Sequence, residues 1–113
     1  MLGSDWNDCL NTVCKKGKWE SVMTAEQYVL ACKMMADILS IIGEYGSYYS
    51  SLAEKQARVL NEDMYEGNHY IRAFTDSGVR IGGKNEKCAR YRINSNSWAI
   101  YSGVADEERG KLS

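Results

Sequence analysis

The sequence predicts a mainly α-helical fold of helical hairpins with short irregular strands between them, and three observations support this class. Apolar residues recur at alternating steps of three and four between residues 20 and 42, which is the period of a helix face. A second, amphipathic stretch follows at 47–64 after a short turn, as in an antiparallel helix pair. The strand-like runs at 70–74 and 79–81 are short. We expect part of an (α/α) toroid, with about two of its hairpins present.

The first expected helix begins near Glu20 and ends at Gly43, a residue that readily forms a left-handed helix cap. One of its faces consists of Val22, Ala25, Val29, Cys32, Ala36 and Leu39. An adjoining face consists of Leu30, Met34, Ile38 and Ile41. Because two faces are apolar, we expect this helix to be buried on several sides.

The second expected helix begins at Ser47 and ends near Met64, after the short turn 43–46. Its inward side chains are Tyr49, Leu52, Ala53, Val59 and Leu60. Glu54, Lys55, Arg58 and Glu62 face water, so this helix is amphipathic.

The remaining chain alternates short strands, turns and helix starts. Strands at 70–74 and 79–81 flank the turn 75–78, a charged loop follows at 84–90, and a helix capped near Ser97 ends at Gly103. Asp106 to Arg109 resembles the first turn of another helix. We therefore divide one domain into an amino-terminal loop (1–19), a helical hairpin (20–66), strands and loop (67–93) and a last helix (94–113). The uncovered apolar face and the late helix start predict a piece of a larger fold.

Composition excludes several classes of function. The chain has 113 residues, of which 44% are hydrophobic and 26% charged, the balance of a globular domain. A net charge of −1 provides no basic surface for nucleic acid or an anionic membrane. No apolar run is long enough to cross a bilayer and no signal peptide is recognisable, so we expect a cytoplasmic protein.

The four cysteines do not predict a metal site. Their spacing is irregular, and a zinc site needs ligands paired at short spacing. The single histidine, His69, lies far from all of them in sequence. We expect reduced thiols, no metal and no cofactor; the cysteines are Cys9, Cys14, Cys32 and Cys88.

The acidic motif Asp5-Trp6-Asn7-Asp8 carries the strongest chemical signal. It combines an acid that can protonate a leaving oxygen, an indole that can stack on a pyranose face and an amide for sugar hydroxyls. Asp and Asn also favour turns and helix caps, so the same residues are compatible with an exposed turn before a helix.

Four blocks of sequence, including this motif, resemble the cellobiose phosphorylase-type inverting glycoside phosphorylases of glycoside hydrolase family ninety-four in their order and approximate spacing. The resemblance extends from about residue 3 to about residue 109. The blocks are D-W-N-D-C-L-N at 5–11, W-E-S-V at 19–22, Y-I-R-A-F-T-D-S-G at 70–78 and I-N-S-N-S-W-A-I-Y-S-G at 93–103.

The resemblance implies a helical catalytic domain that cleaves a β-linked disaccharide or oligosaccharide with inorganic phosphate. The product is then an α-sugar 1-phosphate, formed with inversion. By resemblance, Asp8 is the general acid, Trp6 lines the sugar subsite, and Asp5 and Asn7 support it. Phosphate is a co-substrate and already an anion, so no second carboxylate is needed as a base. None of His69, Arg72 and Lys84 matches a phosphate-binding motif of the family.

Two alternatives remain open. Those enzymes are several times longer, so we expect the isolated chain to be inactive, and it could instead act as a non-catalytic helical module that self-associates through its apolar faces. A hydrolase that uses water would need a base, and no second acid is identified by motif.

Overall fold

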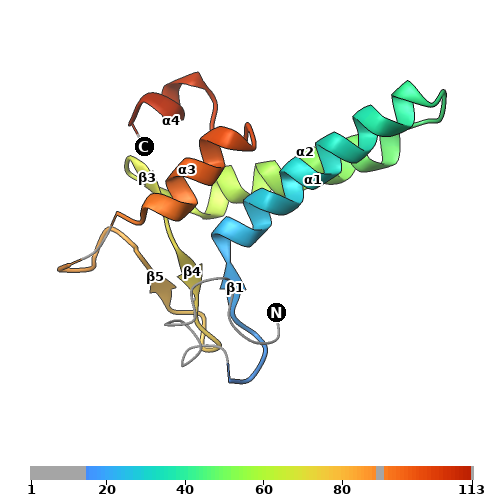
Figure 1. Ribbon diagram of the computed structural model, residues 1–113. Helices are drawn as coiled ribbons and strands as arrows, with labels where there is room; N and C mark the ends of the chain where they lie inside the picture. The colour runs from blue at the N-terminus through green and yellow to red at the C-terminus, as the bar shows by residue number, and fades with distance from the viewer. Residues whose placement is uncertain (1–14, 89–90, 113) are drawn as a thin grey trace.

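The computed structural model describes residues 15–88 and 91–112, and it is mainly α-helical, as predicted (Figure 1). Two long helices, α1 (Val22–Ile41) and α2 (Ser47–Asp63), form an antiparallel hairpin that projects from a base of short strands and two smaller helices. The smaller helices are α3 (Ile93–Tyr101) and α4 (Glu107–Leu112). The strands are β1 (Glu20–Ser21), β2 (Tyr65–Glu66), β3 (His69–Tyr70), β4 (Ala73–Phe74) and β5 (Arg80–Ile81).

Helix α1 begins with a side-chain cap and buries its first half. The Ser21 hydroxyl accepts a hydrogen bond from the Thr24 N–H at 3.3 Å, which satisfies one of the free donors of the first turn. The buried residues of α1 all lie between its start and Cys32, and the helix packs against α2 and α3. Three of them, Val22, Val29 and Cys32, belong to the main core cluster, which also contains Leu60 of α2 and Ala99 of α3.

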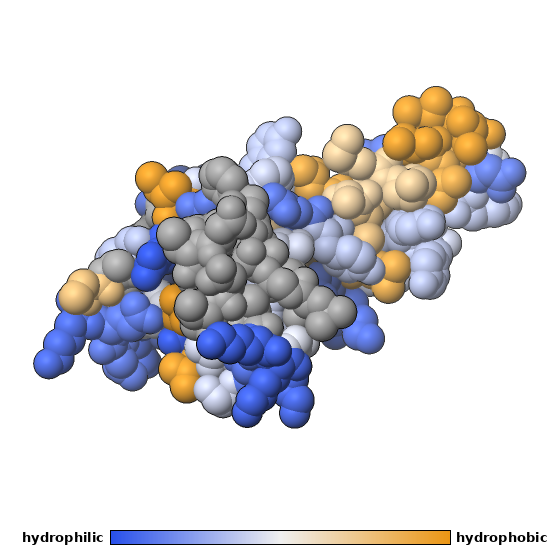
Figure 2. All heavy atoms as spheres, turned by 60° about the horizontal axis from the view of Figure 1, so that its bottom comes forward, coloured by the Kyte–Doolittle hydropathy of each residue, from blue (hydrophilic) through white to orange (hydrophobic). Residues whose placement is uncertain are grey.

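The second half of α1 differs from the prediction, because its adjoining apolar face is exposed. Met34, Ile38 and Ile41 are 54%, 50% and 83% exposed, so the expected burial on several sides is found only in the first half. Figure 2 shows hydrophobic surface gathered at the far end of the hairpin. In its second half, α1 has apolar residues on two faces, and α2 covers only one of these faces.

The turn between the long helices depends on two glycines. Gly43 has φ +81°, the left-handed conformation expected for it. Gly46 lies directly against α1: a Cβ at this position would be only 2.6 Å from the Ala36 carbonyl oxygen. A side chain at 46 would therefore force the two helices apart.

The strands form two small antiparallel sheets, and part of this arrangement was not predicted. β1 pairs with β4, which pairs with β5 across the expected turn, whereas β2 and β3 form a separate hairpin. The expected strand 70–74 is therefore divided: its first residue, Tyr70, pairs with Tyr65 in one sheet, and Ala73 and Phe74 pair in the other. Strand β1 was not predicted, because two residues between a basic loop and a helix give no period-2 pattern.

Helix α3 begins four residues before the expected cap at Ser97, because Ser95 and Asn96 bond the backbone of β3. The Asn96 side-chain oxygen accepts the Tyr70 N–H at 2.9 Å, and the Ser95 hydroxyl donates to the Tyr70 carbonyl at 3.2 Å. At the other end, the Lys33 ammonium donates to the Ser102 carbonyl at 2.7 Å. Gly103 has φ +66° and follows the helix end, as predicted.

Within the residues that the structure describes, no helix is long and apolar enough to cross a membrane.

Candidate functional site

The four residues that the sequence assigns to the site, Asp5, Trp6, Asn7 and Asp8, lie outside the described residues. Their roles therefore remain predictions. The structure describes the chain from residue 15 onward. Residues 15–19 follow the acidic motif in sequence and lead to β1. Of the residues that the structure describes, they are thus the closest in sequence to the motif.

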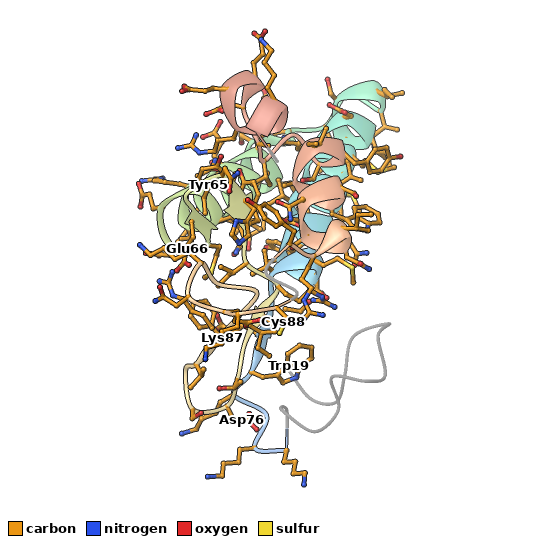
Figure 3. All side chains as sticks on the ribbon, turned by 90° about the vertical axis from the view of Figure 1, so that its left-hand side faces the viewer. Trp19, Tyr65, Glu66, Asp76, Lys87 and Cys88 are labelled. Carbon is orange, nitrogen blue, oxygen red and sulfur yellow. The ribbon has the colours of Figure 1, made fainter. Side chains whose placement is uncertain are left out.

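Asp76 anchors this segment through three backbone hydrogen bonds. One carboxylate oxygen accepts from the Lys16 N–H at 2.7 Å, and the other accepts from the Lys18 and Trp19 N–H groups at 2.7 and 3.0 Å. The hydrogen bond from Lys16, together with those from Lys18 and Trp19, holds the pKa of the Asp76 carboxyl below its usual value of 3.8. We call these contacts the Asp76 anchor; Figure 3 shows the Asp76 side chain beside the segment that leads to Trp19.

The turn that carries Asp76 is itself fixed. The Thr75 N–H donates to the Val79 carbonyl and the Gly78 N–H donates to the Thr75 carbonyl, both at 2.9 Å. The Thr75 hydroxyl accepts from the Val79 N–H at 3.0 Å and also contacts the Ser77 hydroxyl. The Asp76 carboxylate therefore projects from a small rigid turn between β4 and β5.

Trp19 ties the anchored segment to the interior. Its side chain is completely buried and packs with Ala73 of β4 and Ile81 of β5. The next residue, Glu20, pairs with Phe74 across β1 and β4. The chain is thus held by a side-chain anchor, a buried indole and a strand pairing within five residues of sequence (16–20).

Two adjoining cavities lie beside this segment. One, of about 390 Å³, lies between the first turns of α1 and the second half of α2, and its lining includes Trp19, Tyr28 and Gln56. The other, of about 500 Å³, is lined by Lys18, Asp76 and Arg80 among others. They share Glu20, Met64 and Phe74. Aromatic rings beside amide and carboxylate groups are chemically compatible with a sugar.

The β2–β3 hairpin is joined to β5 by a charged cluster. Glu66 pairs with Arg80 and accepts the Lys84 N–H at 2.9 Å. The Lys84 hydrogen bond, followed by that of Arg80, lowers the pKa of Glu66 below its usual value of 4.5. Arg80 also lies over the Phe74 ring, 5.4 Å from its centre. This cluster fixes the sheet that carries the Asp76 anchor.

The polar residues that the sequence left without a phosphate-binding role lie in structural positions. Arg72 is 2% exposed and donates to the Ser21 hydroxyl at 3.0 Å, which joins it to the helix cap of α1. The His69 ring is 2% exposed, and its Nε2 lies 2.8 Å from the Gly82 carbonyl oxygen. Both stabilise the base of the hairpin.

Within residues 15–88 and 91–112, no group of three His, Cys, Asp or Glu side chains could hold a metal ion. Cys32 is a buried free thiol and Cys88 an exposed one. Cys9 and Cys14 lie outside the described residues.

Three of the four blocks that carry the family resemblance meet in space. The block at 19–22 pairs with the block at 70–78 through β1 and β4. The block at 93–103 bonds the same segment through Asn96, Ser95 and the Tyr70 backbone. These three blocks are therefore one structural unit. The fourth block, the acidic motif, precedes the anchored segment in the sequence and lies outside the described residues.

These features describe a helical unit of short strands and a long hairpin, and comparison with known proteins gives its family. The model for the catalytic domain of the glycosyl hydrolase 94 superfamily matches residues 1–113. The chain therefore belongs to this superfamily.

Individual relatives agree with the family match. The solabiose phosphorylase of Paenibacillus borealis is 32% identical over 108 residues, which are 93% of this chain and 14% of that protein. The N,N'-diacetylchitobiose phosphorylase of Vibrio proteolyticus is 32% identical over 114 residues, again 14% of its length. The cyclic beta-(1,2)-glucan synthase NdvB of Rhizobium meliloti is 26% identical over 113 residues, which are 4% of its length. The chain thus spans about one seventh of the phosphorylase relatives (14%).

Proposed function

We propose that this chain is part of the catalytic helical domain of a glycoside phosphorylase. The reaction cleaves a β-linked disaccharide or oligosaccharide with inorganic phosphate and releases an α-sugar 1-phosphate with inversion. The observation that carries the proposal is the family match over residues 1–113, which includes the acidic motif. Relatives named as phosphorylases of solabiose and N,N'-diacetylchitobiose support the same reaction class.

Asp8 is the proposed general acid. It donates its proton to the departing glycosidic oxygen while a phosphate oxygen attacks the anomeric carbon from the opposite face. Phosphate arrives as an anion, so one carboxylic acid completes the proton balance. A hydrolase would instead release the free sugar and would need a second carboxylate as base.

Asp8 must keep its proton near neutral pH, and a neighbouring negative charge or burial raises the pKa of a carboxyl in this way. Asp5 and bound phosphate are the proposed sources of that charge. Trp6 supplies a flat surface for the sugar ring, and the Asn7 amide bonds hydroxyls.

We further propose that the helical hairpin α1–α2 is one hairpin of an (α/α) toroid, whose other walls hold phosphate and the acceptor sugar. A site that works by positioning loses its rate enhancement when a wall is missing. The isolated chain is therefore expected to release no sugar 1-phosphate.

The test is a phosphorolysis assay on two proteins: the chain alone, and the Paenibacillus borealis solabiose phosphorylase with its matching segment replaced by residues 1–113. Each is incubated with phosphate and a panel of β-linked disaccharides, and the product and its anomer are identified by NMR. We expect α-sugar 1-phosphate from the chimera and none from the chain. A folded chimera that releases free sugar without a phosphate requirement would contradict the proposal.

A second candidate function is self-association, and the exposed end of the hairpin favours it. Ile41, Ile42 and Tyr45 are 83%, 65% and 93% exposed and lie close together in sequence at the hairpin tip. Exposed apolar surface of this kind promotes contact between copies. Light scattering should give a dimer or larger species that becomes a monomer in an Ile41→Lys/Ile42→Lys double variant, whereas Ile93→Lys, an equally exposed site on α3, should not change the mass.

A further inference from the structure

We propose that Asp76 is a positioning residue for the sugar-cleaving site, because its carboxylate fixes the segment through which the chain leaves the acidic motif. The segment comprises residues 16–19, and its anchor is the turn between β4 and β5. This inference rests on the proposed function, since the motif positioned is the one to which we assign catalysis.

The sheet explains why a side chain is needed here. Glu20 pairs with Phe74 and Ser21 with Ala73, and continuing this register by two residues would place Lys18 opposite Asp76. The chain turns toward β5 at Thr75, where the Gly78 N–H donates to the Thr75 carbonyl at 2.9 Å. The pairing of β1 with β4 extends only to Glu20 and Phe74, and beyond it the N–H groups of Lys16, Lys18 and Trp19 donate to the Asp76 side chain.

The segment itself is shaped to hold an anion. Gly17 has φ +68°, and on either side of it the N–H groups of Lys16 and Lys18 point to the same carboxylate. Successive N–H groups around a left-handed residue form a concave nest that favours negative charge. A carboxylate offers two oxygens with several lone pairs, so a single Asp76 can accept all three donors, and charge-assisted bonds of this kind are stronger than neutral ones.

The anchor is continuous with the helical hairpin. After Trp19 the chain enters β1, Ser21 caps α1, and the Val22 N–H bonds the Arg72 carbonyl at 3.2 Å. The direction of the chain is thus fixed from Lys16 to the first turn of α1. Among the described residues whose N–H groups bond the Asp76 carboxylate, Lys16 is the nearest in sequence to the acidic motif.

Positioning of this kind has a direct effect on acid catalysis. A general acid acts only when its oxygen lies within hydrogen-bonding distance of the leaving oxygen. A displacement of about 1 Å costs on the order of a hundredfold in rate. Loosening the segment that continues from the motif would therefore reduce catalysis without altering the acid itself.

The test uses amide NMR spectra of the whole chain. In the wild type, the amide protons of Lys16, Lys18 and Trp19 should share one titration, with an apparent pKa below the usual 3.8 of Asp76. In Asp76→Asn this shared titration should disappear, and the amide resonances of residues 5–11 should shift at neutral pH. Asp63→Asn is the matched control, because Asp63 lines the same cavity of about 500 Å³. It should change neither the shared titration nor the amide resonances of residues 5–11.

Two results would overturn the inference. One is a wild-type spectrum in which the three amides do not titrate together, a measurement that requires no variant to fold. The other is a folded Asp76→Asn chain whose resonances at 5–11 are unchanged. Neither readout depends on turnover, so failure of the anchor and failure of the proposed phosphorolysis are distinguishable.

Discussion

At the scale of single residues, the fold gives unusual environments to acids that look ordinary in sequence. Asp76 lies in a turn, where aspartate is common, yet it bonds three N–H groups 57 to 60 residues away. Glu26 lies among the buried residues of α1, where the others include Met23 and Val29, and is completely buried. Within the described part of the chain, neither of its carboxylate oxygens has a hydrogen-bond partner. The spacing of apolar residues predicts which face of a helix a residue occupies. It does not predict contacts between residues that are far apart in sequence.

Glu26 should make the stability of the protein fall as the pH rises. Burial raises its pKa from 4.5 to about 9, against an opposing effect of the Arg72 charge. The group therefore contributes stability that is complete below pH 4.5 and is lost between pH 4.5 and about 9, because the unfolded chain ionises while the folded one keeps its proton. Glu26→Gln should reduce this slope, by at most about 1.4 kcal/mol per pH unit.

Urea unfolding at several pH values between about 5 and 9 measures this difference. Glu62→Gln, on the exposed face of α2, is the control and should keep the wild-type slope. Equal slopes for wild type and Glu26→Gln would show that Glu26 does not hold its proton in the folded state.

At the scale of elements, close approach of the two long helices depends on Gly46. An added Cβ would lie 2.6 Å from the Ala36 carbonyl oxygen and 2.8 Å from its Cα, and neither backbone atom can move without moving α1. Gly46→Ala should therefore destabilise the protein by about 1–3 kcal/mol, the usual cost of overpacking.

The same substitution at another glycine gives the control. Gly110 lies within α4, and the nearest atom to an added Cβ is Ile100 Cγ1 at 3.9 Å, an ordinary contact. Gly110→Ala should stabilise by about 0.5–1 kcal/mol, because alanine is the better helix former. Thermal unfolding of both variants measures the two effects. If Gly110→Ala lost as much stability as Gly46→Ala, the steric explanation would be refuted.

The elements also show what sequence periodicity can and cannot predict. Both long helices, their turn and the end of α3 were predictable, because apolar spacing and glycine caps are local signals. All five strands have two residues each, too few for a period-2 pattern, and β4 and β5 were predictable because a turn signal lies between them at 75–78. The start of α3 depends on bonds to the Tyr70 backbone, so its early position was not predictable from local signals.

At the scale of the whole molecule, the family match includes both the acidic motif and the structural unit that follows it in sequence. The family assignment was predictable from four blocks, three of which form a connected scaffold in the fold. Residue types alone indicated the chemistry of Asp5, Trp6, Asn7 and Asp8, whereas the Asp76 anchor required three-dimensional contacts. The exposed face at the end of the hairpin is compatible with further helices of a toroid or with a second copy.

The most direct test of the account is the dependence of Asp8→Asn on the leaving group, measured in the chimera with the Paenibacillus borealis enzyme. A general acid matters most when the departing oxygen is strongly basic, so we expect kcat for a disaccharide to fall by about 10²–10⁴-fold. The rate with the corresponding glycosyl fluoride, which leaves without protonation, should change far less. Equal losses on both substrates, or no loss on either, would contradict the assignment of Asp8 as the acid.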